Sequence, residues 1–270
     1  FTRAGTWRFH DHMKSEFIGD IVVQGKPETT EECVARNAGK STLFPECWEP
    51  EILHLMETKG FNATFARIDA LYAEDPSFRS NCHDILHAVG KRAYDQYADD
   101  RLVMDNPGTA YCGYGFYHGF IEAMQVVEGA GEFSVTRAYC EELKTVRSGA
   151  SGPCYHGIGH ALFDAVDGTL WGDPRAMTQS TLALCERAAL DPEALSNCAS
   201  GVYNSYANAM SAKNYSLSFE GLDVPAFCNL EKPAYQETCY SELGIGYMGE
   251  EHFTQSEAIA FIRTVPRAFA

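Results

Sequence analysis

The ten cysteines of this 270-residue chain limit its possible folds more than any other feature. Reduced proteins of this size seldom carry so many cysteines without a metal motif or a redox dithiol, and the chain contains no Cys-x-x-Cys. That absence excludes the common zinc ribbons, thioredoxin-type motifs and Cys-x-x-Cys-His haem attachment. We therefore expect disulfide bonds and an oxidising, extracytoplasmic location, whether periplasmic, secreted or at the cell surface.

The spacing of the cysteines indicates how they pair. Four pairs are separated by 14, 14, 13 and 11 positions, each across a loop-like stretch: Cys33–Cys47, Cys140–Cys154, Cys185–Cys198 and Cys228–Cys239. Cys82 and Cys112 remain as a fifth pair. The second members of the last three short pairs recur every 41 to 44 residues, a period typical of stacked helical hairpins. We expect each disulfide to join the end of one helix to the start of the next, which stabilises the fold by roughly 3 kcal/mol per bond.

The chain from Glu28 onward has helical patterning with little strand-like alternation. Apolar residues at positions 61, 65, 68 and 71 follow a helical period. Helix start signals occur at Asp173-Pro174, Asp191-Pro192 and Thr254 with Glu257. The sequence therefore predicts a mainly α fold of about ten helices, arranged as disulfide-stapled helical-hairpin repeats over residues 33–270.

Residues 1–24 differ from the rest because they are rich in strand-forming side chains. A two-stranded ribbon is barely stable alone, so we expect these residues to complete a sheet whose other strands lie upstream of Phe1, followed by a linker over residues 25–32. The run Ala4-Gly5-Thr6-Trp7-Arg8-Phe9-His10-Asp11-His12-Met13, with Gly19-Asp20-Ile21-Val22-Val23, resembles the last two strands of a cupredoxin domain. The resemblance implies a truncated cupredoxin-like domain, in whose family the loop between these strands binds copper.

The loop departs from the cupredoxin pattern because it has no cysteine. Without that thiolate a type 1 copper site is not expected. His10, His12 and Met13 form a second possible metal site, in which copper would be bound by imidazole and thioether groups and by ligands from the absent strands. The alternative is a metal-free cupredoxin-like domain with solvated histidines.

Histidines are concentrated next to the cysteines that open the repeats. His83 and His87 follow Cys82, His118 follows Cys112, and His156 and His160 follow Cys154. Positions i and i+4 share a helix face, so His83/His87, His118/Glu122 and His156/His160 are three potential ligand pairs. If the helices pack around one axis, the three pairs would form a single site for copper, iron or zinc.

Two other interpretations of the histidines remain open, namely a buried acid–base network and plain packing. The later repeats have other polar residues at the corresponding places: Ser200, Asn204, Asn208, Ser241 and Glu242. These could line the same cavity as supporting hydrogen-bonding groups, or belong to terminal repeats that have no site. The stretch Cys239-Tyr-Ser-Glu-Leu-Gly-Ile-Gly-Tyr resembles the secreted, disulfide-bearing relatives of Sel1-like repeats, although the repeat here is longer and its cysteines are more widely spaced.

Charge and motif content exclude several functions. The formal net charge of -16 repels phosphate backbones, so nucleic acid is not expected as a partner, and no apolar stretch reaches the roughly 18 residues of a membrane span. No P-loop, dinucleotide fingerprint, G-x-S-x-G or H-E-x-x-H is present. We predict an extracytoplasmic protein that handles copper or iron or transfers electrons, with a redox partner or an upstream cupredoxin-like domain. A metal-dependent oxidoreductase and a non-catalytic interaction module are the alternatives.

Overall fold

A computed structural model describes residues 5–11, 14–23, 28–39, 44–97, 106–129 and 131–266. The chain divides into two compact units, Phe1–Ile85 and Leu86–Ala270, and helix α4 (Pro76–Tyr97) contributes residues to both. The described part is mainly helical, as the sequence predicted. None of the described helices combines the length and the apolar character that crossing a membrane requires.

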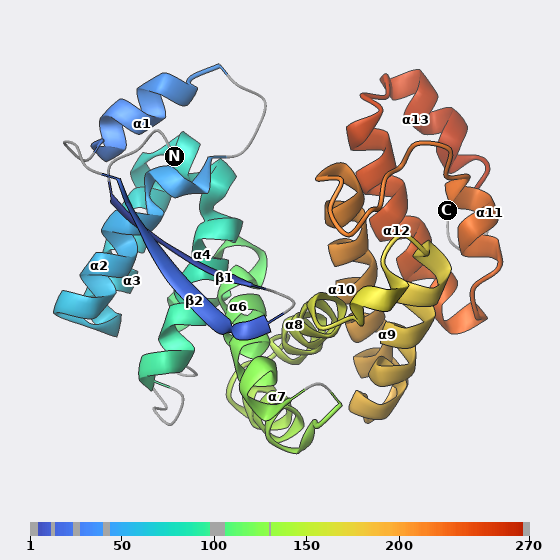
Figure 1. Cartoon of the computed structure of the whole chain (residues 1–270), viewed down its shortest axis with the longest axis horizontal. Coiled ribbons are helices and arrows are strands. Elements are labelled where there is room, and N and C mark those ends of the chain that lie inside the picture. The colour runs from blue at the N-terminus through green and yellow to red at the C-terminus, as the bar shows by residue number, and fades with distance from the viewer. Residues whose placement is uncertain are drawn as a thin grey trace. The chain divides into compact units, whose positions relative to one another are not determined.

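The first unit contains a strand pair and the first helices (Figure 1). Strands β1 (Gly5–Asp11) and β2 (Lys14–Val23) pair antiparallel. Their membership of a cupredoxin-like sheet stays a prediction, and the loop with His12 and Met13, like the side chain of His10, lies outside the described residues.

The helices of the first unit are α1 (Thr30–Asn37), the 3-10 turn η1 (Pro45–Cys47), α2 (Glu49–Lys59), α3 (Phe61–Glu74) and the start of α4. Helix α1 begins inside the expected linker 25–32, because Thr29 and Glu32 form a capping box. Trp48 is buried and packs edge-on against Phe78, with ring centroids 5.8 Å apart, at the centre of this unit's core.

The described residues of the second unit form an all-helical array (Figure 1). After α4 come η2 (Pro107–Ala110), α6 (Tyr111–Glu128), α7 (Ser134–Val146), α8 (Ser151–Asp164), η3 (Gly168–Leu170), α9 (Pro174–Ala188), α10 (Pro192–Ser211), α11 (Val224–Asn229), α12 (Pro233–Glu250) and α13 (Gln255–Ile262). Helix α8 packs against both α6 and α10, and α10 packs against α12, so the long helices stack in chain order. The predicted starts are confirmed, since the carboxylates of Asp173 and Asp191 cap α9 and α10 and a capping box opens α13.

The disulfides join consecutive helices as predicted. Cys140–Cys154 connects α7 to α8, Cys185–Cys198 connects α9 to α10, and Cys228–Cys239 connects α11 to α12. Cys33–Cys47 closes the loop after α1 in the first unit. Cys82 and Cys112 are disulfide-bonded as well, so none of the ten cysteines is a free thiol.

Candidate metal centre

Glycines let three helices approach closely enough for their histidines to meet. A Cβ atom on Gly119 of α6 would lie 1.9 Å from the carbonyl oxygen of His87 on α4. A Cβ atom on Gly157 of α8 would lie 3.1 Å from the Cα atom of His118 on α6. Only glycine leaves room for backbones this close together, and the contacts place side chains from α4, α6 and α8 on one common side. A similar close contact occurs between α8 and α10, where a Cβ atom on Gly201 would lie 2.0 Å from the carbonyl oxygen of His156.

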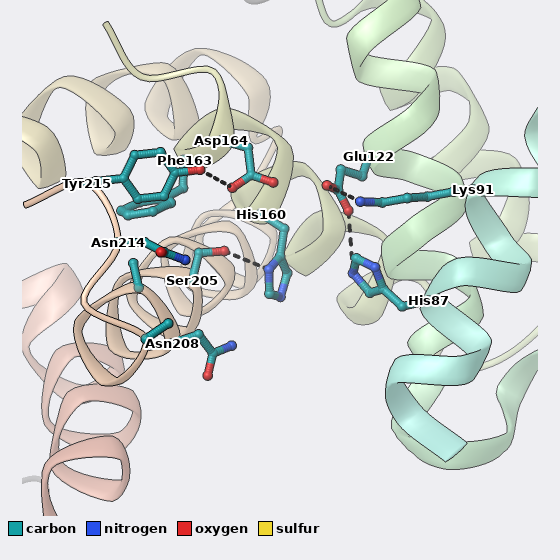
Figure 2. A pocket seen from close by; sticks show the side chains of 12 residues that line it. His87, Lys91, Glu122, His160, Phe163, Asp164, Ser205, Asn208, Asn214 and Tyr215 are labelled. Carbon is teal, nitrogen blue, oxygen red and sulfur yellow. Dashed lines mark hydrogen bonds and ion pairs between the residues drawn. The ribbon is translucent and has the colours of Figure 1, made fainter. Parts of the chain in front are cut away.

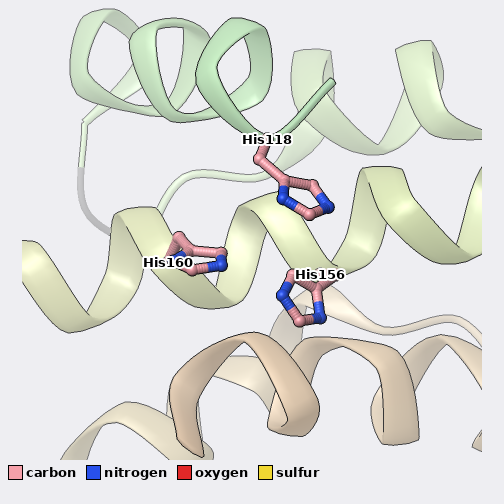
Figure 3. Close-up of side chains that lie close together, drawn as sticks. All are labelled: His118, His156 and His160. Carbon is pink, nitrogen blue, oxygen red and sulfur yellow. The ribbon is translucent and has the colours of Figure 1, made fainter. Parts of the chain in front are cut away.

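Three imidazole rings gather at the centre of this packing (Figure 3). The ring centroids of His118 and His156 are 4.6 Å apart, those of His156 and His160 are 4.8 Å apart, and those of His118 and His160 are 5.4 Å apart. One nitrogen from each ring lies within 4.8 Å of the other two. A tetrahedral ion with metal–nitrogen bonds of about 2.0 Å requires donor atoms roughly 3.3 Å apart, so the three rings would move closer together on binding one ion. His118 is 6% exposed, so the cluster is shielded from solvent on the α6 side.

A hydroxyl group fixes the orientation of one of these rings. The Oγ atom of Ser205 on α10 lies 2.6 Å from Nδ1 of His160 (Figure 2). Because Nδ1 of this ring is hydrogen-bonded, Nε2 is the nitrogen that would bind a metal ion. Metal-binding histidines are generally oriented by such a hydrogen bond to the ring nitrogen that does not bind the metal.

His87 and Glu122 lie at the edge of the three-imidazole cluster. The His87 ring centroid is 6.1 Å from that of His118 and 5.8 Å from that of His160. Glu122 is 6% exposed and sits between two positively ionisable groups: its Oε2 is 3.5 Å from Nε2 of His87, and its Oε1 is 2.7 Å from Nζ of Lys91. The lysine neutralises a carboxylate that would otherwise be costly to bury, and it keeps Glu122 within reach of the cluster.

A pocket of about 300 Å³ opens beside the cluster, with His160, His87 and Glu122 on one wall (Figure 2). Asp164 and Tyr215 form part of the rim, where the tyrosine hydroxyl donates to a carboxylate oxygen at 3.4 Å. Desolvation, and secondly the negative charge of Glu122, raise the pKa of the Asp164 carboxyl to about 7. The pocket thus joins ionisable groups to the imidazoles in one cavity.

Five of the six predicted ligands come together in the second unit: His87, His118, Glu122, His156 and His160. The sixth, His83, is exposed and belongs to the first unit, and its role as a ligand stays a prediction. The side chains of His10, His12 and Met13 lie outside the described residues. His54 and His252 are both exposed.

The polar residues of the later repeats separate into two groups. Ser200 and Asn204 of α10 both hydrogen-bond to the carboxylate of Glu242 on α12, at 2.6 and 3.0 Å. Asn208, one turn further along α10, lines the pocket beside the cluster, and Ser241 is exposed. Only Asn208 therefore takes the cavity-lining position that the sequence left open for this set.

Sequence reasoning missed Lys91, Asp164 and Ser205. Lys91 follows His87 by four positions and Asp164 follows His160 by four positions, the spacing that identified His118 and Glu122 as a pair. That spacing could have found both residues. No comparable signal points to Ser205, which comes from the next repeat.

No protein-family model matches the chain, and neither a curated protein nor a solved structure matches it significantly.

Proposed function

We propose that the second unit binds one transition-metal ion through His118, His156 and His160. The observation that carries this proposal is the convergence of three imidazoles, each offering a nitrogen within 4.8 Å of the others. Simple packing accounts less well for the cluster, because three rings that can each be protonated would repel one another when charged, whereas a metal ion uses them in their neutral form.

The donor set favours copper or zinc. Imidazole nitrogens suit Zn, Cu, Fe and Ni, and copper(II) binds most tightly among the divalent ions of this series. Three imidazoles leave at least one coordination position for water or for Glu122, whose Oε2 points toward His87. The resemblance of residues 1–24 to a cupredoxin also favours copper, and it suggests that electrons or copper ions pass between this centre and a cupredoxin-like neighbour.

The ten disulfide-bonded cysteines support an oxidising, extracytoplasmic location for this function. Exposed free thiols tend to oxidise in such a compartment. A site built only from imidazole and carboxylate groups fits that condition.

The test is a metal titration of the oxidised protein and of two variants. We expect the unaltered chain, after chelation, to bind one copper(II) or zinc(II) ion per molecule. The variant H118A/H156A/H160A should bind none tightly, whereas H54A, which removes an exposed histidine of the first unit, should behave like the unaltered chain. Absence of stoichiometric binding by the unaltered chain, or equal binding by the triple variant, would show that the histidines only pack.

Catalysis at the same metal is a second candidate, because the pocket shares His160 with the proposed ligand set. A metal-dependent oxidoreductase needs an open coordination position that a small molecule can reach. Azide added to the copper(II)-loaded protein should then produce a new charge-transfer absorption band. An unchanged spectrum would indicate a saturated ion and would favour storage or transport over catalysis.

A further inference from the structure

The pocket beside the histidines has a polar wall that the metal site does not use. Asn208 of α10 and Asn214 of the following loop present side-chain amides, and Tyr215 presents a hydroxyl that donates to Asp164. Figure 2 shows these groups lying around one cavity, across from His87. Amide and hydroxyl groups can both donate hydrogen bonds to a ligand and accept them from it. A carboxyl group accepts, and it also donates when it is protonated. Such a wall fits a molecule that carries several hydroxyl groups.

The charges of the pocket do not select an ionic ligand. Lys91 is its cationic side chain and is already bonded to Glu122 at 2.7 Å. The remaining carboxyl, that of Asp164, accepts from Tyr215. The carboxyl groups of Glu122 and Asp164 would repel a small anion, and the ammonium group of Lys91 would repel a cation. An uncharged ligand is therefore repelled least.

Two aromatic rings, those of Phe163 and Tyr215, also line the pocket, and Trp171 packs against Tyr215 outside it. The ring of Tyr215 packs edge-on against Phe163, with centroids 5.6 Å apart, and against Trp171, with centroids 5.2 Å apart. Trp171 is 38% exposed although its ring is large and apolar. An apolar ring next to polar groups that can orient a ligand is the usual composition of a small-molecule site.

The loop that supplies this wall has an uncommon backbone. Lys213, Tyr215 and Ser216 have φ angles of 55°, 54° and 58°, in the left-handed region that residues other than glycine rarely adopt. Backbone hydrogen bonds from Asn214 to Ala209 and from Leu217 to Asn214 hold the loop in this form. Backbone strain of this kind is concentrated at functional sites. Here the strained loop places Asn214 and Tyr215 at the cavity.

We infer that this pocket binds a neutral, polyhydroxylated small molecule the size of a monosaccharide. The hydroxyls would hydrogen-bond to Asn208, Asn214 and Asp164, and the apolar face of the sugar ring would lie against Tyr215. The volume of about 300 Å³ is at the small end of the range for ligand pockets, which suits a single ring. The inference does not depend on a bound metal.

The test measures binding of defined probes by saturation-transfer difference NMR, on the metal-free and the metal-loaded full chain. The neutral ring probes are D-glucose, D-xylose and N-acetyl-D-glucosamine, with glycerol as a polyol that has no ring and with citrate and spermidine as charged probes. We expect at least one ring probe to bind to both forms, at least about tenfold more tightly than glycerol, citrate or spermidine. Absence of binding by every ring probe up to about 50 mM, or binding of a charged probe or glycerol that is equally tight, would overturn the inference.

Three variants show whether the bound probe occupies this pocket. N208A removes one amide, and Y215N removes the ring while keeping a residue that tolerates a positive φ. Each should weaken the binding about tenfold. N197A is the matched control, because Asn197 lies on the same helix as Asn208 but outside this pocket. An equal effect of N197A and N208A would place the ligand elsewhere and contradict the inference. Sugar binding should be retained by H118A/H156A, which removes two proposed metal ligands that do not line the pocket, and this separates the result from that of the metal titration.

Discussion

Gly119 of α6 lies directly against the carbonyl oxygen of His87 on α4, so that a Cβ atom at position 119 would come within 1.9 Å of that oxygen. The relation is reciprocal, because a Cβ on Gly90 of α4 would lie 2.0 Å from the carbonyl oxygen of Phe116 on α6. The two helices therefore touch backbone to backbone at the turn that carries His87 and His118. The positions of both imidazoles depend on this contact.

A methyl group at position 119 should separate these helices and disturb the site. We expect G119A to lower the free energy of unfolding by about 2 kcal/mol or more, because the clash is with backbone and cannot be relieved by a side-chain rotation. Metal affinity should fall with it. G249A is the control: Gly249 lies in helix α12 with open space around its Cβ position, so alanine there should be neutral or stabilising by up to about 1 kcal/mol. Urea unfolding of both variants checks this, and equal stability of the two would refute the close-contact explanation.

Loss of the Ser205 hydroxyl should weaken metal binding without unfolding the protein. Its Oγ lies 2.6 Å from Nδ1 of His160 and orients that ring. Removal of such supporting hydrogen bonds typically costs about 10- to 100-fold in metal affinity. We expect S205A to show a loss in this range by competition with a chelator of known affinity. S211A, at the exposed end of the same helix, should bind like the unaltered chain. Unchanged affinity in S205A would mean that the hydroxyl does not support a metal ligand.

The disulfide between Cys185 and Cys198 should stabilise the unit that holds the site. It closes a loop of 13 positions between α9 and α10, the helix that carries Ser205. We expect C185A/C198A to lower the free energy of unfolding by roughly 3 kcal/mol and to weaken metal binding. C33A/C47A removes a bond of similar span from the first unit and should leave metal affinity unchanged. A loss of affinity that is as large in C33A/C47A would contradict the assignment of the site to the second unit alone.

The carboxylate of Glu128 should make stability depend on pH through the start of α7. It accepts hydrogen bonds from the backbone N–H groups of Val135 and Thr136, at 2.7 and 3.0 Å, and from the hydroxyls of Ser134 and Thr136. Burial alone would raise the pKa of this carboxyl, but these hydrogen bonds outweigh burial and hold the pKa below its ordinary value. The stabilisation is therefore complete above the unfolded-state pKa of about 4.3 and is lost as the pH falls through the lower folded-state pKa.

Comparison of E128Q with the unaltered chain isolates this contribution. At pH 7 we expect E128Q to be less stable by about 1 kcal/mol, a value typical of a lost helix cap. The difference should shrink toward zero as the pH falls through the lowered folded-state pKa, because the carboxylate is then protonated in both states. E132Q removes the charge of an exposed glutamate nearby and should show neither effect. A difference between E128Q and the unaltered chain that does not change with pH would show that the cap does not depend on ionisation.

The helical repeats could be predicted because disulfides impose strict distances. In the four pairs separated by 11 to 14 positions the Cα atoms are 5.4 to 5.7 Å apart, so each pair forces the chain to turn back between two helical segments. The shared helix face of His156 and His160 likewise follows from their spacing alone. The disulfide turns and the shared helix face both depend on residues that are close together in the sequence, so they can be predicted from spacing.

The contacts between repeats could not be predicted in the same way. Ser205 reaches His160 across 45 positions, and the glycine contacts between α8 and α10 depend on how two helices rotate about their axes. Spacing along the chain fixes which residues share a face, but packing decides which face turns inward. His83 shares a helix face with His87 by the same spacing rule, and its part in a metal site stays a prediction.

X-ray absorption spectroscopy of the copper- or zinc-loaded protein tests the central claim most directly, because it counts the imidazole ligands. We predict three imidazole nitrogens at about 2.0 Å from the ion, and fewer in H118A, H156A or H160A. H54A should give the same spectrum as the unaltered chain. A bound ion surrounded mainly by oxygen ligands, or an imidazole count that none of the three substitutions lowers, would contradict the three-histidine metal centre.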